Sequence, residues 1–192
     1  MRDRETDSWW SIMSSTAIGG ELEGTDLETL SYGEKATWKD WVSRHPETLV
    51  LSVDGDEYVD STHYDNYMAS DGTFRDMEVD DERLAAKTPV YAFHHDDRPW
   101  AVPHTAFEDG RIFSTRKLGH RGVLLYRAGG APIYESTRAW LVDPELAARG
   151  LPITELLALA DSGASEGLEP LPGFDTFWYT WVAVNRRSKI LD

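Results

Sequence analysis

The segment TWKDWVSRHPETLVL (Thr37–Leu51) has a counterpart near the other end of the chain, FWYTWVAVNRRSKIL (Phe177–Leu191). At one constant offset, the two segments share two tryptophans, a valine, a hydroxyl residue and a leucine. In each, the tryptophans and the valine are spaced i, i+3 and i+4, which places them on one face of a short helix. His45-Pro46 ends the first helix, because the residue before proline disfavours helical dihedral angles. The apolar residues that follow predict a strand, so a helix–strand unit is expected twice.

The repeat extends upstream of the tryptophans. DLETL at residues 26–30 is answered by GLEPL at 167–171, and RDRETDSWW at 2–10 more weakly by YESTRAW at 134–140. We therefore expect one domain over residues 1–192, with copies at about 1–53 and 88–192 linked by an acidic loop region at 54–87.

A run of strands is predicted before the second Trp-x-x-Trp helix. PVYAF and PWAVP read as a hairpin around HHDDR, and RIFST, GVLLYR and APIYES continue the β-rich stretch up to residue 136. Two helices, at 143–150 and 153–163, follow from periodicity and from glycines at their ends. Nothing comparable precedes the first copy. It is expected either to take its sheet from elsewhere or to belong to a chain shortened at its front. The expected fold class is α+β and β-rich.

Composition excludes several classes of protein. The chain has 192 residues and no cysteine, which rules out disulfides, thiolate metal sites and a cysteine nucleophile. The net charge of −15 lies in residues 1–97, with 23 Asp/Glu against 8 Lys/Arg. Such a surface repels phosphate backbones, so no nucleic-acid partner is expected. The acidic charge predicts instead either a solvated face or a surface that attracts a basic partner. There is no apolar run long enough to span a membrane and no export-signal core, so the chain as encoded is predicted to be cytoplasmic.

The ordered series DRETDSWW, TWKDW…HPETLVLS and HYDNY resembles a bacterial and archaeal family, domain of unknown function 3179. The matching positions are Asp3, Arg4, Thr6, Ser8, Trp10, Trp38, Trp41, His45, Pro46, Thr48, Leu51, Tyr64 and Tyr67. Arg2, Ile12 and Ser15 depart from the tyrosine, glutamine and glycine common in the family. The resemblance implies a further N-terminal β-rich segment with a Cys-Pro-x-Cys element, often behind an export signal or lipid anchor. A longer N-terminus would therefore make the protein extracytoplasmic. The resemblance implies no activity.

The densest polar cluster lies at the N-terminus. Its members are Asp3, Arg4, Thr6, Ser8 and Trp10. One interpretation is a ligand pocket in which Arg4 pairs with an anionic group beside a tryptophan wall. The other is structural, with an Asp–Arg pair and Ser/Thr turn hydrogen bonds. The tryptophans at 38, 41, 178 and 181 are predicted to be core, since aromatic residues at helical spacing usually are.

A metal site is a second hypothesis. His94, His95 and His104 lie near carboxylates, and imidazole with carboxylate suits Zn, Fe or Mn. Against this, adjacent strand residues point to opposite faces, and the HHDDR stretch has the composition of a turn. No recognised metal-site spacing occurs in the sequence, so no cofactor is predicted, a divalent metal being the alternative.

No nucleophile elbow, phosphate-binding loop or dinucleotide fingerprint occurs in the sequence. The leading prediction is a binding or assembly module, with a second copy or a partner protein completing the N-terminal sheet, or with a small-molecule ligand. The alternative is a metal-dependent or carboxylate-based hydrolase.

Overall fold

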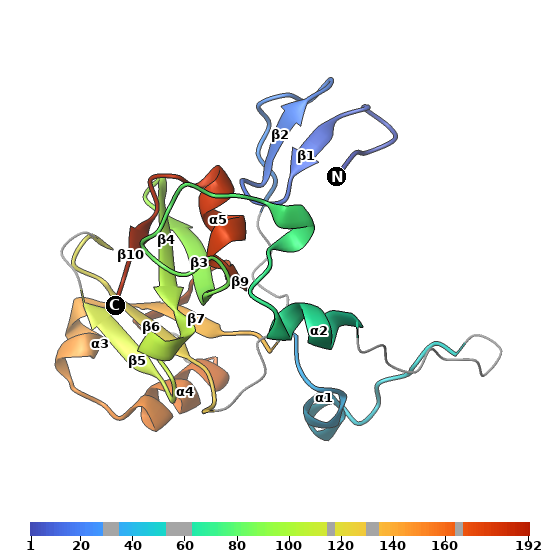
Figure 1. The fold of residues 1–192 in the computed structure, drawn as a ribbon. Helices are drawn as coiled ribbons and strands as arrows, with labels where there is room; N and C mark the ends of the chain where they lie inside the picture. The colour runs from blue at the N-terminus through green and yellow to red at the C-terminus, as the bar shows by residue number, and fades with distance from the viewer. Residues whose placement is uncertain (29–34, 53–62, 115–117, 130–134, 164–166) are drawn as a thin grey trace.

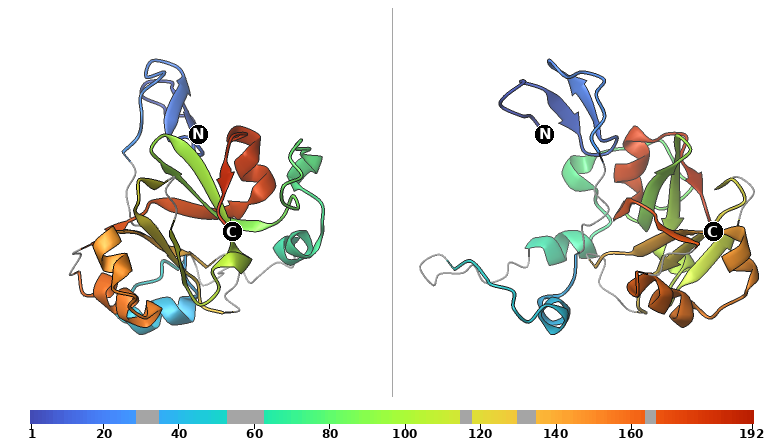
Figure 2. Two further views of the ribbon diagram at one scale, coloured as in Figure 1. Left: turned by 90° about the vertical axis from the view of Figure 1, so that its left-hand side faces the viewer. Right: turned by 180° about the vertical axis from the view of Figure 1, so that it is seen from behind.

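The computed structural model describes residues 1–28, 35–52, 63–114, 118–129, 135–163 and 167–192 (Figure 1). Within these residues the fold is α+β and β-rich, as predicted from the sequence. Most of it is a four-layer body of two sheets with helices on both outer faces. The described residues up to residue 87 (1–28, 35–52 and 63–87) lie mainly beside this body (Figures 1 and 2).

The first sheet has the strand order β10-β4-β3-β9. Its strands are β3 (Pro89–His95), β4 (Arg98–Pro103), β9 (Gly173–Phe177) and β10 (Lys189–Ile190). The predicted hairpin at its centre is confirmed. Asp96 and Asp97 both have positive φ, as a two-residue turn of the type that matches strand twist requires. β10 pairs parallel to β4 at the sheet edge.

The second sheet has the order β5-β6-β7-β8, and all its pairs are antiparallel. Its strands are β5 (Arg111–Ser114), β6 (Gly122–Tyr126), β7 (Arg138–Val142) and β8 (Leu168–Pro170). Two helices cover its outer face, α3 (Pro144–Ala148) and α4 (Ile153–Asp161). Both helices were predicted, whereas β7 and β8 were not. The predicted strand APIYES lies mostly outside the described residues.

Alternation along β3 and β4 creates two cores, since successive side chains of a strand point to opposite faces. Tyr91, Phe93, Trp100 and Val102 face the second sheet. The opposite face contributes Val90, Ala92 and Ala101 to a cluster with helix α5 (Trp178–Val184). Both faces of the β3–β4 hairpin are therefore covered within the chain.

The N-terminal part adds a hairpin and two helices beside the body. These are β1 (Trp9–Ser11), β2 (Thr16–Gly19), α1 (Trp38–Arg44), α2 (His63–Ala69) and the 3-10 turn η1 (Phe74–Asp76). α1 stands away from the four layers in Figure 1 and in the view from behind in Figure 2. Two hydrogen bonds between Lys35 and Ser136, one to a backbone carbonyl and one to a side-chain hydroxyl, link the residues just before α1 to the body.

Three expectations differ from the structure. Residues 48–52 form no strand, because no strand of the described part of the chain lies beside them to pair with them. The acidic segment expected to be loop contains α2. The sequence spaces Phe174 and Phe177 with Trp178 and Trp181 as on one face of a helix, which predicts that all four lie on the second helix, but both phenylalanines belong to β9. Among the described residues, no helix has the length and apolarity needed to cross a membrane.

Candidate functional site

α1 and α5 have the same backbone geometry. Each is seven residues long, and they begin at Trp38 and Trp178. Each ends when the amide of the C-cap residue donates to the carbonyl of the second tryptophan, at 2.9 Å for His45 and 3.0 Å for Asn185. The C-cap dihedral angles also agree, with φ −132°, ψ 68° and φ −118°, ψ 55°. The shared residues therefore encode the same local structure.

The second tryptophan of each helix makes the same side-chain hydrogen bond. Trp41 Nε1 donates to Thr48 Oγ1 at 2.9 Å, and Trp181 Nε1 donates to Ser188 Oγ at 2.7 Å. Both bonds join residues seven apart. This contact explains why a hydroxyl residue occupies positions 48 and 188, since a buried indole N–H requires an acceptor.

The two helices differ in burial. Trp178 and Trp181 are fully buried, whereas the Trp38 side chain is 57% exposed and α1 has no buried residue. After α1, Leu49 and Leu51 are 93% and 87% exposed. The prediction that these tryptophans are core is confirmed for α5 and is wrong for Trp38, because no sheet lies over α1 in the described part of the chain.

One continuous piece of chain, residues 79–103, supplies most of what covers α5. We call it the cover segment. Val79 and Leu84 pack on the α5 cluster from outside, and residues of β3 and β4 pack on it from the sheet. The backbone carbonyls of Thr88 and Ala86 accept from the amides of Trp178 and Tyr179, both at 2.9 Å. These bonds satisfy amides that the start of a helix leaves without an internal partner.

Arg83 of the cover segment clamps the start of α5. Its guanidinium lies 5.1 Å from the centre of a Trp178 ring, and its Nη1 donates to the carbonyl of Ser188 at 2.7 Å. Asp81 holds the guanidinium through Nε and Nη2. The hydrogen bond from Arg83 lowers the pKa of Asp81 below its usual value, which keeps the pair charged.

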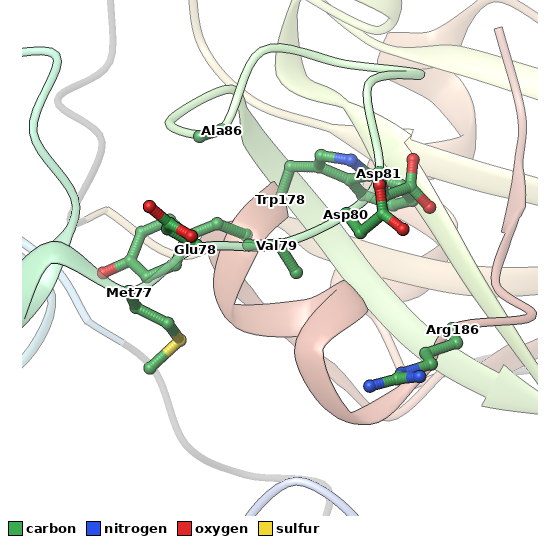
Figure 3. A pocket seen from close by; sticks show the side chains of 9 residues that line it. Met77, Glu78, Val79, Asp80, Asp81, Ala86, Trp178 and Arg186 are labelled. Atoms are coloured by element: carbon green, nitrogen blue, oxygen red, sulfur yellow. The ribbon is translucent and has the colours of Figure 1, made fainter.

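A surface pocket of about 730 Å³ lies where the cover segment crosses α5 (Figure 3). Trp178 and Tyr179 line it from the helix, and Arg186 lies on the side opposite Met77 and Glu78. Its remaining lining residues are Val79, Asp80, Asp81 and Ala86. Three carboxylates against one guanidinium give the pocket an acidic wall.

A tyrosine pair fastens α2 to α5. The hydroxyl groups of Tyr67 and Tyr179 lie 2.7 Å apart, and the Lys87 ammonium lies 4.0 Å from the Tyr67 ring centre. Burial, with the hydrogen bond to Tyr179, raises the pKa of Tyr67 to about 12. Burial alone would raise the pKa of Tyr179, but hydrogen bonds from Tyr67, Thr180 and the Phe74 amide, together with Lys87, outweigh burial and lower it.

Four of the five residues predicted at the N-terminal cluster contact one another. The Asp3 carboxylate accepts from Thr6 N at 2.7 Å and from Trp10 Nε1 at 2.8 Å. The Thr6 hydroxyl lies 2.8 Å from that of Ser8. These bonds, led by the one from Thr6 N, lower the pKa of Asp3 to about 2. Arg4 is exposed and stands outside this network, so the predicted Asp–Arg pair is not formed.

The structure does not gather the three predicted histidines. His94 and His95 lie at the turn end of the β3–β4 hairpin, opposite Pro99 and Arg98, whereas His104 follows the other end of β4. Nε2 of His94 lies 3.2 Å from Oδ1 of Asn185. Among the described residues, no group of three His, Asp or Glu side chains is placed to hold a metal ion.

A buried polar network around Asp175 joins the two sheets. The carboxylate accepts from Thr137 N at 2.7 Å and from Thr137 Oγ1 at 2.5 Å. His104 Nε2 lies 2.7 Å from one carboxylate oxygen, and Arg127 Nη1 lies 3.5 Å from the same oxygen. Sequence reasoning did not find Asp175, Thr137 or Arg127, because the bonds that join them link residues far apart in the chain. Such a network fixes how the sheets pack.

Comparison with known proteins identifies a family. Neither the curated proteins nor the solved structures include a match to this chain. The model of the family described as protein of unknown function (DUF3179) matches residues 1–187. That match spans α1, α5 and the cover segment, and it agrees with the motifs read from the sequence. The chain therefore belongs to the DUF3179 family.

Proposed function

We propose that the protein is an assembly module in which α1 and residues 48–51 bind a β-hairpin of a partner polypeptide. On this proposal the chain carries a duplicated unit, and the partner completes the first copy as the cover segment completes the second. The contrast between α1 and α5 is the observation that carries the proposal. The two helices have equal local geometry, but one is buried and the other exposed.

Four exposed apolar residues lie on α1 and shortly after it, and we call them the apolar surface. Trp38, Leu49, Val50 and Leu51 are 57%, 93%, 61% and 87% exposed. Isolated exposed apolar residues are ordinary on a protein surface, but four on one short unit mark an interaction site. Of their counterparts, Trp178 is buried and Ile190 and Leu191 pack against the core, whereas Lys189, the counterpart of Leu49, is exposed. The apolar surface therefore has the composition of a binding site for a partner.

Residues 48–51 also offer backbone groups to a partner. Apart from the Thr48 amide, which donates to the His45 carbonyl at 3.1 Å, these groups make no hydrogen bond within the described part of the chain. Their counterpart, β10, forms a parallel pair with β4, and the Leu191 amide donates to the carbonyl of Ala101 at 3.0 Å. An extended segment with free backbone groups can add to the edge of a partner sheet, which contributes hydrogen bonds as well as apolar contacts.

A second copy of the chain is a poor occupant for this surface. Its β3–β4 hairpin is already covered on both faces, by α5 and by the second sheet. A homodimer would therefore have to exchange strands at the cost of its own core, whereas a partner with a free hairpin would not.

A synthetic cover segment provides a defined probe. The peptide has the sequence of residues 79–103 with Asp96→Asn and Asp97→Gly, because Asn-Gly favours the two positive φ values of this turn. Circular dichroism establishes first that the peptide folds as a hairpin. It is then titrated into the full chain, and backbone hydrogen exchange of residues 45–52 is followed by mass spectrometry.

We expect the folded probe to slow exchange in residues 48–51. Val50→Asp should abolish this protection, and Val184→Asp is the matched control, because Val184 is 59% exposed but lies on α5. No protection by the folded probe, or equal protection in Val50→Asp, would show that α1 is not a binding face. Protection that appears without probe and rises with protein concentration would identify a second copy as the occupant and overturn the proposal of a partner.

A further inference from the structure

We infer that the partner presents an arginine that stacks on Trp38 and hydrogen-bonds the backbone carbonyl of Thr48. This inference rests on the proposed function and specifies the chemistry of the partner. Its starting point is Arg83, which is not part of the helix–strand unit but makes two contacts to it. One is to the ring of Trp178 and the other is to the carbonyl of Ser188.

Both acceptors of Arg83 have equivalents in the first unit. Trp38 corresponds to Trp178, and Thr48 corresponds to Ser188, at the same offset along the sequence. Among the described residues, no cation stacks on the Trp38 ring, and the Thr48 carbonyl accepts no hydrogen bond. The first unit thus presents an exposed indole face and a free carbonyl where the second unit holds a guanidinium.

The charged residues of the two units differ. The first unit has Asp40 and Glu47 where the second has Thr180 and Arg187, and it has Lys39 and Arg44 where the second has Tyr179 and Val184. In the second unit the countercharge for Arg83 comes from Asp81, within the cover segment itself. In the first unit the Asp40 carboxylate accepts from the Thr37 hydroxyl at the helix cap, whereas Glu47 is exposed and directly precedes Thr48. A guanidinium at the Thr48 carbonyl would therefore find its countercharge in Glu47.

The geometry favours arginine over lysine. A guanidinium is planar, so it can lie flat on an indole and still direct N–H groups to a carbonyl and a carboxylate. A lysine ammonium is a compact, strongly hydrated charge and satisfies these contacts less well. Arg83 makes all three kinds of contact at once in the second unit.

The test compares three probes on the full chain. They are the cover-segment peptide described above and the same peptide with Arg83→Lys or Arg83→Gln. Dissociation constants come from titrations followed by hydrogen exchange of residues 48–51. We expect Arg83→Gln to weaken binding about tenfold or more and Arg83→Lys to be intermediate. Added salt should weaken the arginine probe more than the glutamine probe.

A variant of the protein closes the comparison. In Trp38→Leu the surface stays apolar but loses its aromatic face, so the advantage of the arginine probe over the glutamine probe should shrink. This double-mutant cycle isolates the contact between arginine and Trp38. If all three probes bind the wild-type chain equally, the arginine inference fails and the proposed function stands. If no folded probe binds, both fail.

Discussion

Truncation of the second tryptophan in each helix should have very different effects on stability. Trp181 is fully buried, and its ring centre lies 5.6 Å from that of Phe174 and 5.1 Å from that of His94. Trp181→Ala leaves a cavity in a packed core, which costs about 3–5 kcal/mol of unfolding free energy. Trp41 is only half-buried, and no sheet of the described residues lies over it, so water can replace the lost contacts. For Trp41→Ala we expect a loss of at most about 1 kcal/mol.

Urea denaturation followed by far-ultraviolet circular dichroism measures both effects. The free-energy difference follows from the midpoints, provided that wild type and variants share one slope with denaturant. Hydrogen exchange of the α1 amides measures the stability of this helix alone, because a helix outside the body can unfold without the rest of the molecule. Equal losses in the two variants, or a loss of 3 kcal/mol or more for Trp41→Ala, would show that α1 is packed and would refute the reasoning from its exposure.

Three further predictions concern the polar clusters. The pKa of Asp3 is lowered to about 2, so its carboxylate stabilises the folded N-terminal turn. This stabilisation is complete above the usual pKa of 3.8 and is lost as the pH falls toward 2. The NMR signal of the Trp10 indole N–H should follow this titration, and a midpoint near 4 would contradict it. Arg4→Ala should leave the melting temperature of the free protein unchanged, because Arg4 is exposed. If Arg4 binds a ligand, the variant should also lose the rise in melting temperature that this ligand causes in the wild type. Asp175→Asn should cost about 3–5 kcal/mol in urea denaturation, since it removes the buried charge that His104, Thr137 and Arg127 share; a near-neutral effect would show that this carboxylate does not hold the two sheets together.

Local patterns in the sequence predict the local structure well. The first Trp-x-x-Trp helix begins within one residue of the position that the spacing indicates, because helical periodicity and the His45-Pro46 break act over a few residues. The β3–β4 hairpin forms for the same reason. The second Trp-x-x-Trp helix begins only at Trp178, after two phenylalanines that share its spacing. α2 was missed because its sequence, HYDNYMA, is acidic and tyrosine-rich rather than clearly amphipathic.

Patterns that depend on distant partners are not predictable in this way. The apolar run at residues 48–52 resembles a strand but forms none, whereas Lys189–Ile190 forms β10 because β4 lies beside it. Arg83 and Asp175 were missed as key contacts for a related reason. Their partners Ser188 and Thr137 lie 105 and 38 residues away, and no motif marks such a pair.

The cover of α5 comes from one continuous stretch of chain, and this bears on what could cover α1. The carbonyls that satisfy the first amides of α5, the arginine on Trp178, and the small residues of β3 and β4 follow one another within residues 79–103. One continuous segment that ends in a hairpin is therefore enough to cover such a helix, and a complete second sheet assembled from distant strands is not needed. A partner could supply this with one projecting segment, and ordering one segment costs less entropy than ordering several. Since α1 already has its final geometry, that segment would meet a preorganised surface, which favours binding.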